Sequence, residues 1–284
     1  MKLITWNIQW GRGLDGRVDL ERIVREARAI ADFDVLCTQE VADNFPGLAG
    51  NDDRDQFAEL ARLLPGYTMA AGFGVDVAGQ EGRRRRFGNA IFTRYTVISA
   101  RRHALPWPAD RGKSTMPRVA VEATLQAPMG PLRLTTAHLE YYSDVQRRAQ
   151  ARHLRHLHDE ACHRVSQPGD PSVEEGPFDA TRQTIDAILA GDFNFPPEHP
   201  AYADIQASGP ADCPPYRDSW TIANGRRPHT PTFCVHDHSY SKEPYCCDFV
   251  FVSETLASRV QAMRIDSETR ASDHQPVLLE LDDR

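Results

Sequence analysis

One stretch decides the fold: Leu189-Ala190-Gly191-Asp192-Phe193-Asn194-Phe195. The apolar run Ile185–Ala190, which leads into Gly191 and Asp192, predicts a buried strand. Pro196-Pro197 cannot continue that strand. Alternate residues of a strand project to the same side. Asp192 and Asn194 should therefore reach together from one edge of a sheet. The alternative interpretation is an ordinary polar turn, because Gly, Asp and Asn are turn residues.

Similar polar residues stand at the ends of other predicted strands. The strands and residues are Lys2–Ile8 with Asn7, Val35–Val41 with Glu40, Leu132–His138 with His138, Cys246–Val252 with Asp248, and Val277–Leu281 preceded by Asp273 and His274. With Asp192 and Asn194 the set holds four carboxylates, two imidazoles and two amides. This recurrence favours one shared site over a series of separate turns.

The chemistry of such a site follows from its charges. Crowded carboxylates repel one another, so the cluster needs a divalent cation, raised pKa values, or both. Oxygen ligands favour Mg²⁺ or Mn²⁺ over zinc. A hard cation beside a carboxylate base and an imidazole suits phosphoester hydrolysis. Zinc binding by Cys234, His236, His238 and Cys246 is a weaker alternative, because their spacing matches no usual zinc-finger pattern.

The rest of the chain reads as alternating helices and strands. Apolar residues at helical spacing predict helices over Asp19–Ile30, Asp53–Leu64 and Ser143–Val165. Further strands are predicted at Tyr67–Ala71, Asn89–Thr93, Thr96–Ala104, Arg118–Gln126 and Arg259–Ile265, with a Gly-rich loop over Gly72–Arg86. Residues 166–180 are predicted as a surface insertion, and we expect 1–284 to form a single domain.

Composition bounds the classes of protein that the chain can be. It has 284 residues, a net charge of −7 and no apolar run of the roughly 18 residues that a membrane span needs. No signal peptide is visible at the start, so a cytoplasmic location and six reduced cysteines are expected. The histidines of the longest helix, at 153, 156, 158 and 163, are expected mostly on its solvated face.

Taken together, these motifs resemble the endonuclease/exonuclease/phosphatase superfamily, which has the DNase I-like fold. The matching pieces, in the family's order, are Thr5-Trp6-Asn7, Thr38-Gln39-Glu40, Gly88-Asn89-Ala90-Ile91-Phe92, Thr136-Ala137-His138-Leu139, Gly191-Asp192-Phe193-Asn194, Cys247-Asp248-Phe249-Val250-Phe251-Val252 and Ser272-Asp273-His274-Gln275-Pro276-Val277. The resemblance implies an α+β fold. The architecture that it implies is a four-layer α/β/β/α sandwich of two mostly antiparallel sheets with outer helices.

The resemblance also implies a role for each residue of the metal and water side of the site. Glu40 is the implied main metal ligand, with Asn7 and Asp273 beside it. Asp192 would orient or deprotonate the attacking water, and Asn194 would hold phosphate or water. The two asparagines have an alternative role as turn caps.

The phosphate side is implied in the same way. His274 would bind the scissile phosphate and be oriented by Asp248, and His138 would donate to a phosphate oxygen. Arg118 resembles a position that supports the site, although surface arginines are common. The run Arg83–Arg86 is interpreted mainly as a solvated charge cluster, with contact to substrate phosphate as the alternative.

The expected function is a Mg²⁺- or Mn²⁺-dependent phosphoric ester hydrolase, first of all a phosphodiesterase or nuclease. One alternative is a phosphomonoesterase acting on a small molecule or lipid head group, and another is an inactive binding module. The expected partner is a phosphate-ester substrate, with nucleic acid as one candidate, and no obligate protein partner is indicated. The acidic balance argues against a high-affinity binder of duplex DNA.

Overall fold

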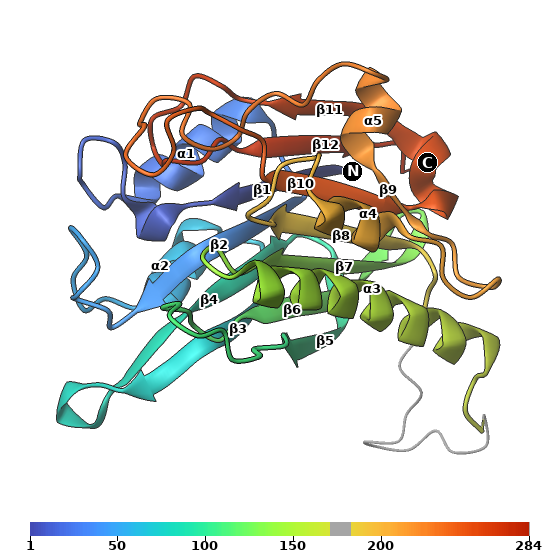
Figure 1. Ribbon diagram of the computed structural model, residues 1–284, viewed down its shortest axis with the longest axis horizontal. Helices are drawn as coiled ribbons and strands as arrows, with labels where there is room; N and C mark the ends of the chain where they lie inside the picture. The colour runs from blue at the N-terminus through green and yellow to red at the C-terminus, as the bar shows by residue number, and fades with distance from the viewer. Residues whose placement is uncertain (171–182, 284) are drawn as a thin grey trace.

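The computed structural model describes residues 1–170 and 183–283, and its strands form two six-stranded sheets (Figure 1). The first sheet has the order β11-β12-β1-β2-β4-β3 and contains β1 (Lys2–Asn7), β2 (Val35–Asp43), β3 (Thr68–Ala78), β4 (Arg84–Thr93), β11 (Val260–Ile265) and β12 (Val277–Leu281). The second has the order β5-β6-β7-β8-β10-β9 and contains β5 (Thr96–Ala104), β6 (Val119–Ala127), β7 (Gly130–His138), β8 (Ala187–Asp192), β9 (Tyr216–Asp218) and β10 (Asp248–Ser253).

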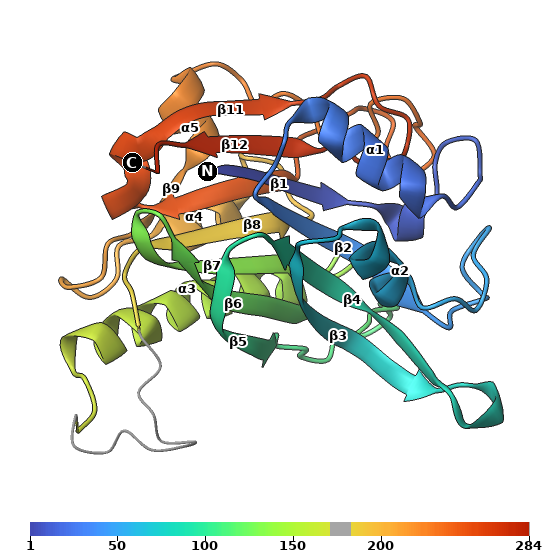
Figure 2. The same cartoon turned by 180° about the vertical axis from the view of Figure 1, so that it is seen from behind.

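Helices cover the outer faces of the two sheets. The helices are α1 (Leu20–Ile30), α2 (Gln56–Leu63), α3 (Asp144–Ser166), α4 (Pro200–Gln206) and α5 (Ser219–Asn224), with short 3₁₀ helices at Gln9–Gly11, Gln80–Gly82 and Glu254–Arg259. Figure 1 shows α3 and α4 in front of the second sheet, and Figure 2, seen from behind, shows α1 and α2 in front of the first. The expected four-layer α+β sandwich is confirmed.

The layers follow from apolar side chains on both faces of the central strands. In β1, Leu3 packs into the core between the sheets, whereas Ile4 packs into the cluster beneath α1 and α2. In β8, Ile188 faces the same inter-sheet core and Leu189 packs toward α3 and α4. Strands that are covered on both faces are expected to be continuously apolar, as these are.

Each sheet has one parallel pair of strands, and its other neighbouring strands are antiparallel. The parallel pairs are β1–β2 and β7–β8, joined by α1 and α3 respectively. The strand order of β1 to β4 in the first sheet recurs as β7 to β10 in the second, a structural repeat that no sequence repeat reveals. Parallel strands end at the same edge, so both pairs deliver their last residues to one region.

The predicted loop over Gly72–Arg86 is wrong, because most of this segment is a β3–β4 hairpin in which Ala78 pairs with Arg84. The glycines reflect close approach of backbones: a Cβ atom at Gly88 would lie 1.9 Å from the carbonyl oxygen of Gly72. In the predicted solvated charge cluster, Arg83–Arg86, three arginines form ion pairs with acids: Arg83–Asp53, Arg84–Asp76 and Arg86–Asp43.

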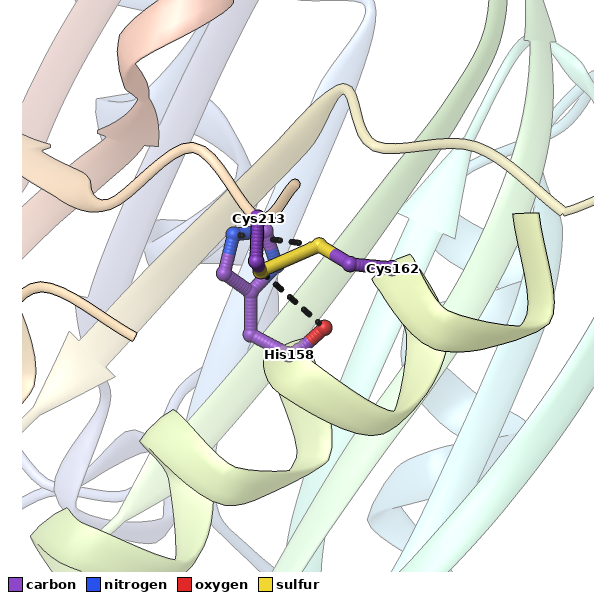
Figure 3. Close-up of side chains that lie close together, drawn as sticks. All are labelled: His158, Cys162 and Cys213. Carbon is purple, nitrogen blue, oxygen red and sulfur yellow. Dashed lines mark hydrogen bonds between the residues drawn. A yellow bond between two sulfur atoms is a disulfide. The ribbon is translucent and has the colours of Figure 1, made fainter. Parts of the chain in front are cut away.

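Three of the four histidines of α3, at 153, 156 and 163, are at least partly exposed as expected, and the fourth is not. His158 is fully buried, because the helix carries it under the loop before β9, where its Nε2 lies 2.7 Å from the carbonyl oxygen of Pro214. Cys162 and Cys213 form a disulfide and are not reduced thiols (Figure 3). Their Cα atoms lie 5.4 Å apart, a separation that a disulfide spans. Cys37, Cys234, Cys246 and Cys247 are free and buried.

The group of His158, Cys162 and Cys213 is close enough in space to suggest a metal site. Both ring nitrogens of His158 are engaged, however, Nδ1 with the guanidinium of Arg133 and Nε2 with Pro214. Burial and the charge of Arg133 lower the pKa of His158 to about 3. This cluster is therefore a packed structural contact between α3 and the loop before β9.

Two further expectations concern segments rather than side chains. Ser166 belongs to α3, and residues 171–180 of the predicted insertion lie outside the described part of the chain. Within the described residues no helix has both the length and the apolar character to cross a membrane.

Candidate active site

The carboxyl ends of the central strands meet across the two sheets. Asp192, the last residue of β8, accepts a hydrogen bond from Nδ2 of Asn7, the last residue of β1, at 3.0 Å. The same Asp192 oxygen lies 3.4 Å from Nε2 of His138, which ends β7, and 3.6 Å from Nε2 of His274. Asp192 is thus the point where groups from both sheets converge.

Backbone irregularities aim the side chains at this point. Glu40 has a φ of 59° and lies at a register shift in the pairing of β2 with β4, a bulge that turns its side chain toward the site. Gly191 has a φ of 144°, and a Cβ there would lie 2.0 Å from the carbonyl oxygen of Ala137. Only glycine lets β8 run so close to β7 directly before Asp192.

These groups form the floor of a pocket of about 290 Å³. Of the nine predicted site residues, seven line the pocket directly: Glu40, Arg118, His138, Asp192, Asn194, Asp273 and His274. The other two lie behind them, with Asn7 bonded to Asp192 and Asp248 bonded to His274. The structure therefore brings the whole predicted set together.

Asn194 is fixed beside Asp192 by its backbone and side chain. Its backbone N–H donates to Oδ1 of Asp192 at 2.9 Å, and its Nδ2 donates to the carbonyl oxygen of Leu139 at 2.9 Å. Its φ of 55° belongs to the left-handed region that asparagine tolerates. One Nδ2 hydrogen remains for a water or phosphate in the pocket, because an amide nitrogen carries two.

His274 is held as a cation by buried carboxylates. Its Nδ1 lies 2.9 Å from Oδ2 of Asp248, which also lies 3.5 Å from the Sγ of Cys247. Burial by itself would lower the pKa of His274, but the charges of Asp248 and Asp192 outweigh it and hold that pKa well above its ordinary value. Such a ring can present its Nε2–H to an anionic oxygen.

His138 has the opposite electrostatic character. Burial, together with the nearby charge of Arg118, lowers the pKa of His138 to about 3. Arg118 forms a buried ion pair with Glu140, with Nε and Oε2 3.2 Å apart. His138 is therefore a neutral ring, able to donate from one nitrogen and accept at the other.

The residues around Glu40 fit a divalent cation. Burial and the charge of Asp273 raise the pKa of Glu40 to about 7, and burial likewise raises the pKa of Asp273. Two crowded acids with raised pKa values favour the binding of a cation, whose charge would stabilise both carboxylates. Oxygen donors are also the ligands that Mg²⁺ and Mn²⁺ prefer.

Gln9 is a site residue that the sequence analysis missed. It is buried in the pocket wall, and its Nε2 donates to Oδ2 of Asp273 at 2.7 Å. Its Oε1 has no hydrogen-bond partner in the described structure, so an oxygen is left over beside the proposed metal ligands. The signal was present, because Asn7 and Gln9 repeat the spacing of Asp192 and Asn194.

A second missed feature is the aromatic wall of the same pocket. The residues of this wall are Trp10, Phe45, Phe87, Tyr141, Tyr142, Phe233 and Tyr240. They come from separate loops and strands, and no local pattern in the sequence groups them. Glu140 was missed for the same reason, since its partner Arg118 is 22 residues away.

A two-sheet sandwich that gathers carboxylates, imidazoles and amides at its strand ends offers the groups that phosphoester hydrolysis needs. The chain belongs to the endonuclease/exonuclease/phosphatase family, whose model matches residues 4–274. A search of curated protein sequences returned no match.

Solved structures share the fold at low sequence identity. A mannosyl-6-phosphatase of Bacteroides thetaiotaomicron is 19% identical with a TM-score of 0.68, and 99% of each chain is covered. A family protein of Beutenbergia cavernae is 22% identical with a TM-score of 0.65, covering 99% of this chain and 71% of that one. The catalytic domain of human Nocturnin is 18% identical with a TM-score of 0.61, covering 99% and 94%. At these identities the likeness supports the fold alone.

Proposed function

We propose that the protein is a Mg²⁺- or Mn²⁺-dependent phosphodiesterase in which Asp192 orients and deprotonates the attacking water. The observation that carries this proposal is the position of Asp192. One of its oxygens lies within 3.6 Å of Asn7, His138 and His274, and the other accepts from the backbone of Asn194. A carboxylate fixed in this way at the floor of a pocket can hold water and take its proton.

Glu40, Asp273 and Asn7 would hold the cation: Glu40 and Asp273 line the pocket, Asn7 lies behind Asp192, and Oε1 of Gln9 is a further oxygen nearby. When bound there, a divalent cation would supply positive charge that stabilises the phosphate oxygens and makes a neighbouring water more acidic. Asn7 keeps a second function in any case, because its Nδ2 holds Asp192 in place.

The phosphate-binding groups are His274, Asn194 and His138, and Arg118 supports them from its buried ion pair with Glu140. His274, held as a cation by Asp248, binds a phosphoryl oxygen, and Asn194 donates its second amide hydrogen. His138 is neutral and donates a hydrogen bond without adding charge. The pocket floor thus supplies few fixed positive charges besides the cation, which suits a phosphodiester with its single negative charge better than a monoester dianion.

A substrate comparison tests the proposal. The protein should hydrolyse bis(p-nitrophenyl) phosphate with Mg²⁺ or Mn²⁺, be much slower on p-nitrophenyl phosphate, and stop when a chelator is added. Preference for the monoester would favour a phosphomonoesterase. Silence on both esters, with retained phosphate binding, would favour a binding module.

A thermal unfolding measurement separates metal binding from turnover. A ligand that binds only the folded state stabilises it by about 2.7 kcal/mol at a hundredfold excess over its dissociation constant. Mg²⁺ or Mn²⁺ should therefore raise the melting temperature of the wild-type protein, and Glu40→Gln should reduce that rise. Equal rises in both proteins would remove Glu40 from the ligand set.

A further inference from the structure

The pocket combines a charged floor with an aromatic wall. Tyr141 packs edge-on against Tyr142, with ring centres 4.9 Å apart, and against Phe233 at 6.5 Å. Phe233 in turn stacks on Tyr240 at 6.2 Å and lies over the ring of His274 at 4.5 Å. The wall therefore runs without a break from a catalytic imidazole to the mouth of the pocket.

Two rings of this wall are open to solvent. Tyr142 is 59% exposed and Tyr240 is 52% exposed, although both line the pocket. Large exposed apolar side chains grouped at a concave site are typical of a ligand-binding surface. Trp10, Phe45 and Leu48 add further apolar surface to the same pocket.

The mouth offers little to a polyanion. Among the described residues that line the pocket, Arg118 is the only Lys or Arg, and it is already paired with Glu140. Binding of a nucleic-acid duplex depends on several Lys or Arg contacts to successive phosphates. The volume of about 290 Å³ lies at the low end of ligand pockets, enough for a phosphate and one ring system.

We infer that the substrate is a small phosphoester with a single phosphate, whose ester group carries a flat, uncharged ring that seats against Tyr142 and Tyr240. This inference rests on the proposed function, because it assigns the scissile phosphate to the floor beside His274. The aromatic wall then selects the ester group, because stacking on an aromatic ring stabilises flat apolar groups whatever their substituents.

Binding of non-hydrolysable phosphonates tests the inference without turnover. The probes are methyl-, cyclohexyl- and phenylphosphonate, each with one oxygen methylated so that it carries the single charge of a diester. They are titrated calorimetrically into the Mg²⁺-loaded protein. We expect phenylphosphonate to bind at least about tenfold more tightly than methylphosphonate, with the cyclohexyl compound between them. In Tyr142→Ala and Tyr240→Ala this preference should fall severalfold.

Matched variants separate the ring from the hydroxyl. Tyr142→Phe and Tyr240→Phe should keep the preference for phenylphosphonate, because only the rings are needed. Val145→Ala removes surface from an exposed apolar residue of α3 outside the pocket and should change nothing. Loss of preference in the Phe variants would overturn the stacking assignment.

The possible outcomes also separate this inference from the proposed function. Equal affinities for methyl- and phenylphosphonate in an enzyme that hydrolyses diesters would overturn the inference and leave the function standing. A clear phenyl preference without hydrolysis of any ester would overturn the proposed function and leave the assignment of the ring-binding wall standing. Binding of no phosphonate at all, or tighter binding of a short DNA duplex than of phenylphosphonate, would overturn the inference.

Discussion

His138 and His274 reach the same carboxylate oxygen from different sheets and carry different charges. His138 ends β7 of the second sheet, and His274 lies in the segment that leads into β12 of the first. Both are buried, and their Nε2 atoms lie 3.4 and 3.6 Å from Asp192. The partner at the second ring nitrogen differs. Nδ1 of His274 lies 2.9 Å from Oδ2 of Asp248, whereas Nδ1 of His138 lies 3.9 Å from Oε1 of Glu40 and the charge of Arg118 is nearby.

The difference shows that burial alone does not decide which role an imidazole can take, because the charges around His274 outweigh its burial and those around His138 do not. Burial disfavours the cation in both rings, yet the pKa of His138 falls to about 3 and that of His274 rises. Asp248 and Asp192 therefore hold His274 as a phosphate-binding cation, while the neighbouring His138 stays a neutral hydrogen-bond donor. Asp192 touches both rings, so its removal should have the largest effect.

Asp192→Asn should lower kcat by about 10²–10⁴, the usual contribution of a positioned general base. The amide keeps the shape and can still accept from Asn7, but it cannot take a proton. Fold and KM should change little, as expected for an interaction made in the transition state. Steady-state kinetics on the diester found in the substrate comparison, with circular dichroism, measures both. Wild-type turnover by a folded Asp192→Asn protein would contradict the mechanism.

Asp248→Asn tests the His274 side of the comparison. Without the carboxylate at Nδ1, the pKa of His274 should fall, and its protonated form should be lost at lower pH. Because a protonated His274 binds the phosphate, the falling alkaline limb of the pH–kcat/KM profile should move to lower pH. Activity at its maximum should drop about tenfold to a hundredfold, as for other partners that orient an imidazole.

The metal response is the control for Asp248→Asn. Stabilisation by Mg²⁺ should stay close to that of the wild-type protein, because Asp248 contacts His274 and is not among the charges that raise the pKa of Glu40. Weakening of the metal response as strong as in Glu40→Gln would assign Asp248 to the cation instead.

Much of this geometry was predictable, because strand ends leave a mark in the sequence. Polar residues after apolar runs located Asn7, His138 and Asp192, and the parallel pairs β1–β2 and β7–β8 bring those ends together. The resemblance of the motifs to a known family supplied the layers and the roles, which apolar periodicity alone does not provide.

The features that the sequence did not predict have a common physical cause, because each depends on contacts between residues far apart in the chain. The hairpin of β3 and β4 resembles a loop in composition, since its glycines and arginines are explained only by strand pairing and by acids elsewhere in the chain. His158 resembles its exposed helical neighbours until the loop before β9 covers it. The aromatic wall likewise exists only once separate loops lie together.

His138→Gln tests the neutral histidine through stability. The unfolded chain protonates this histidine near pH 6.5 and the folded protein only near pH 3, so His138 contributes its own share to the stability that the wild-type protein loses as pH falls from 6.5. At pH 5 that loss is about 2 kcal/mol, at 1.36 kcal/mol per pH unit. His138→Gln binds no proton and should escape it.

Urea unfolding of the metal-free protein at pH 7 and pH 5 makes this measurement. The control is His156→Gln, because the side chain of His156 is 63% exposed and lies on the outer face of α3. It should lose as much stability between the two pH values as the wild-type protein does. An equal loss in His138→Gln would mean that His138 is not held neutral.

Arg118→Met asks how much of that neutrality comes from charge and how much from burial. Burial is the larger cause of the low pKa of His138 and Arg118 the next, so removing the guanidinium should raise the pKa by on the order of one unit and no further. NMR titration of the His138 ring measures this pKa.

Because Arg118→Met leaves Glu140 unpaired in a buried place, the double variant Arg118→Met/Glu140→Gln is the matched control. A rise in both would assign the effect to the lost cation, whereas a rise in the single variant alone would assign it to the uncompensated carboxylate. An unchanged pKa in both would leave burial as the whole cause, and the two histidines would then differ only because Asp248 accompanies one of them.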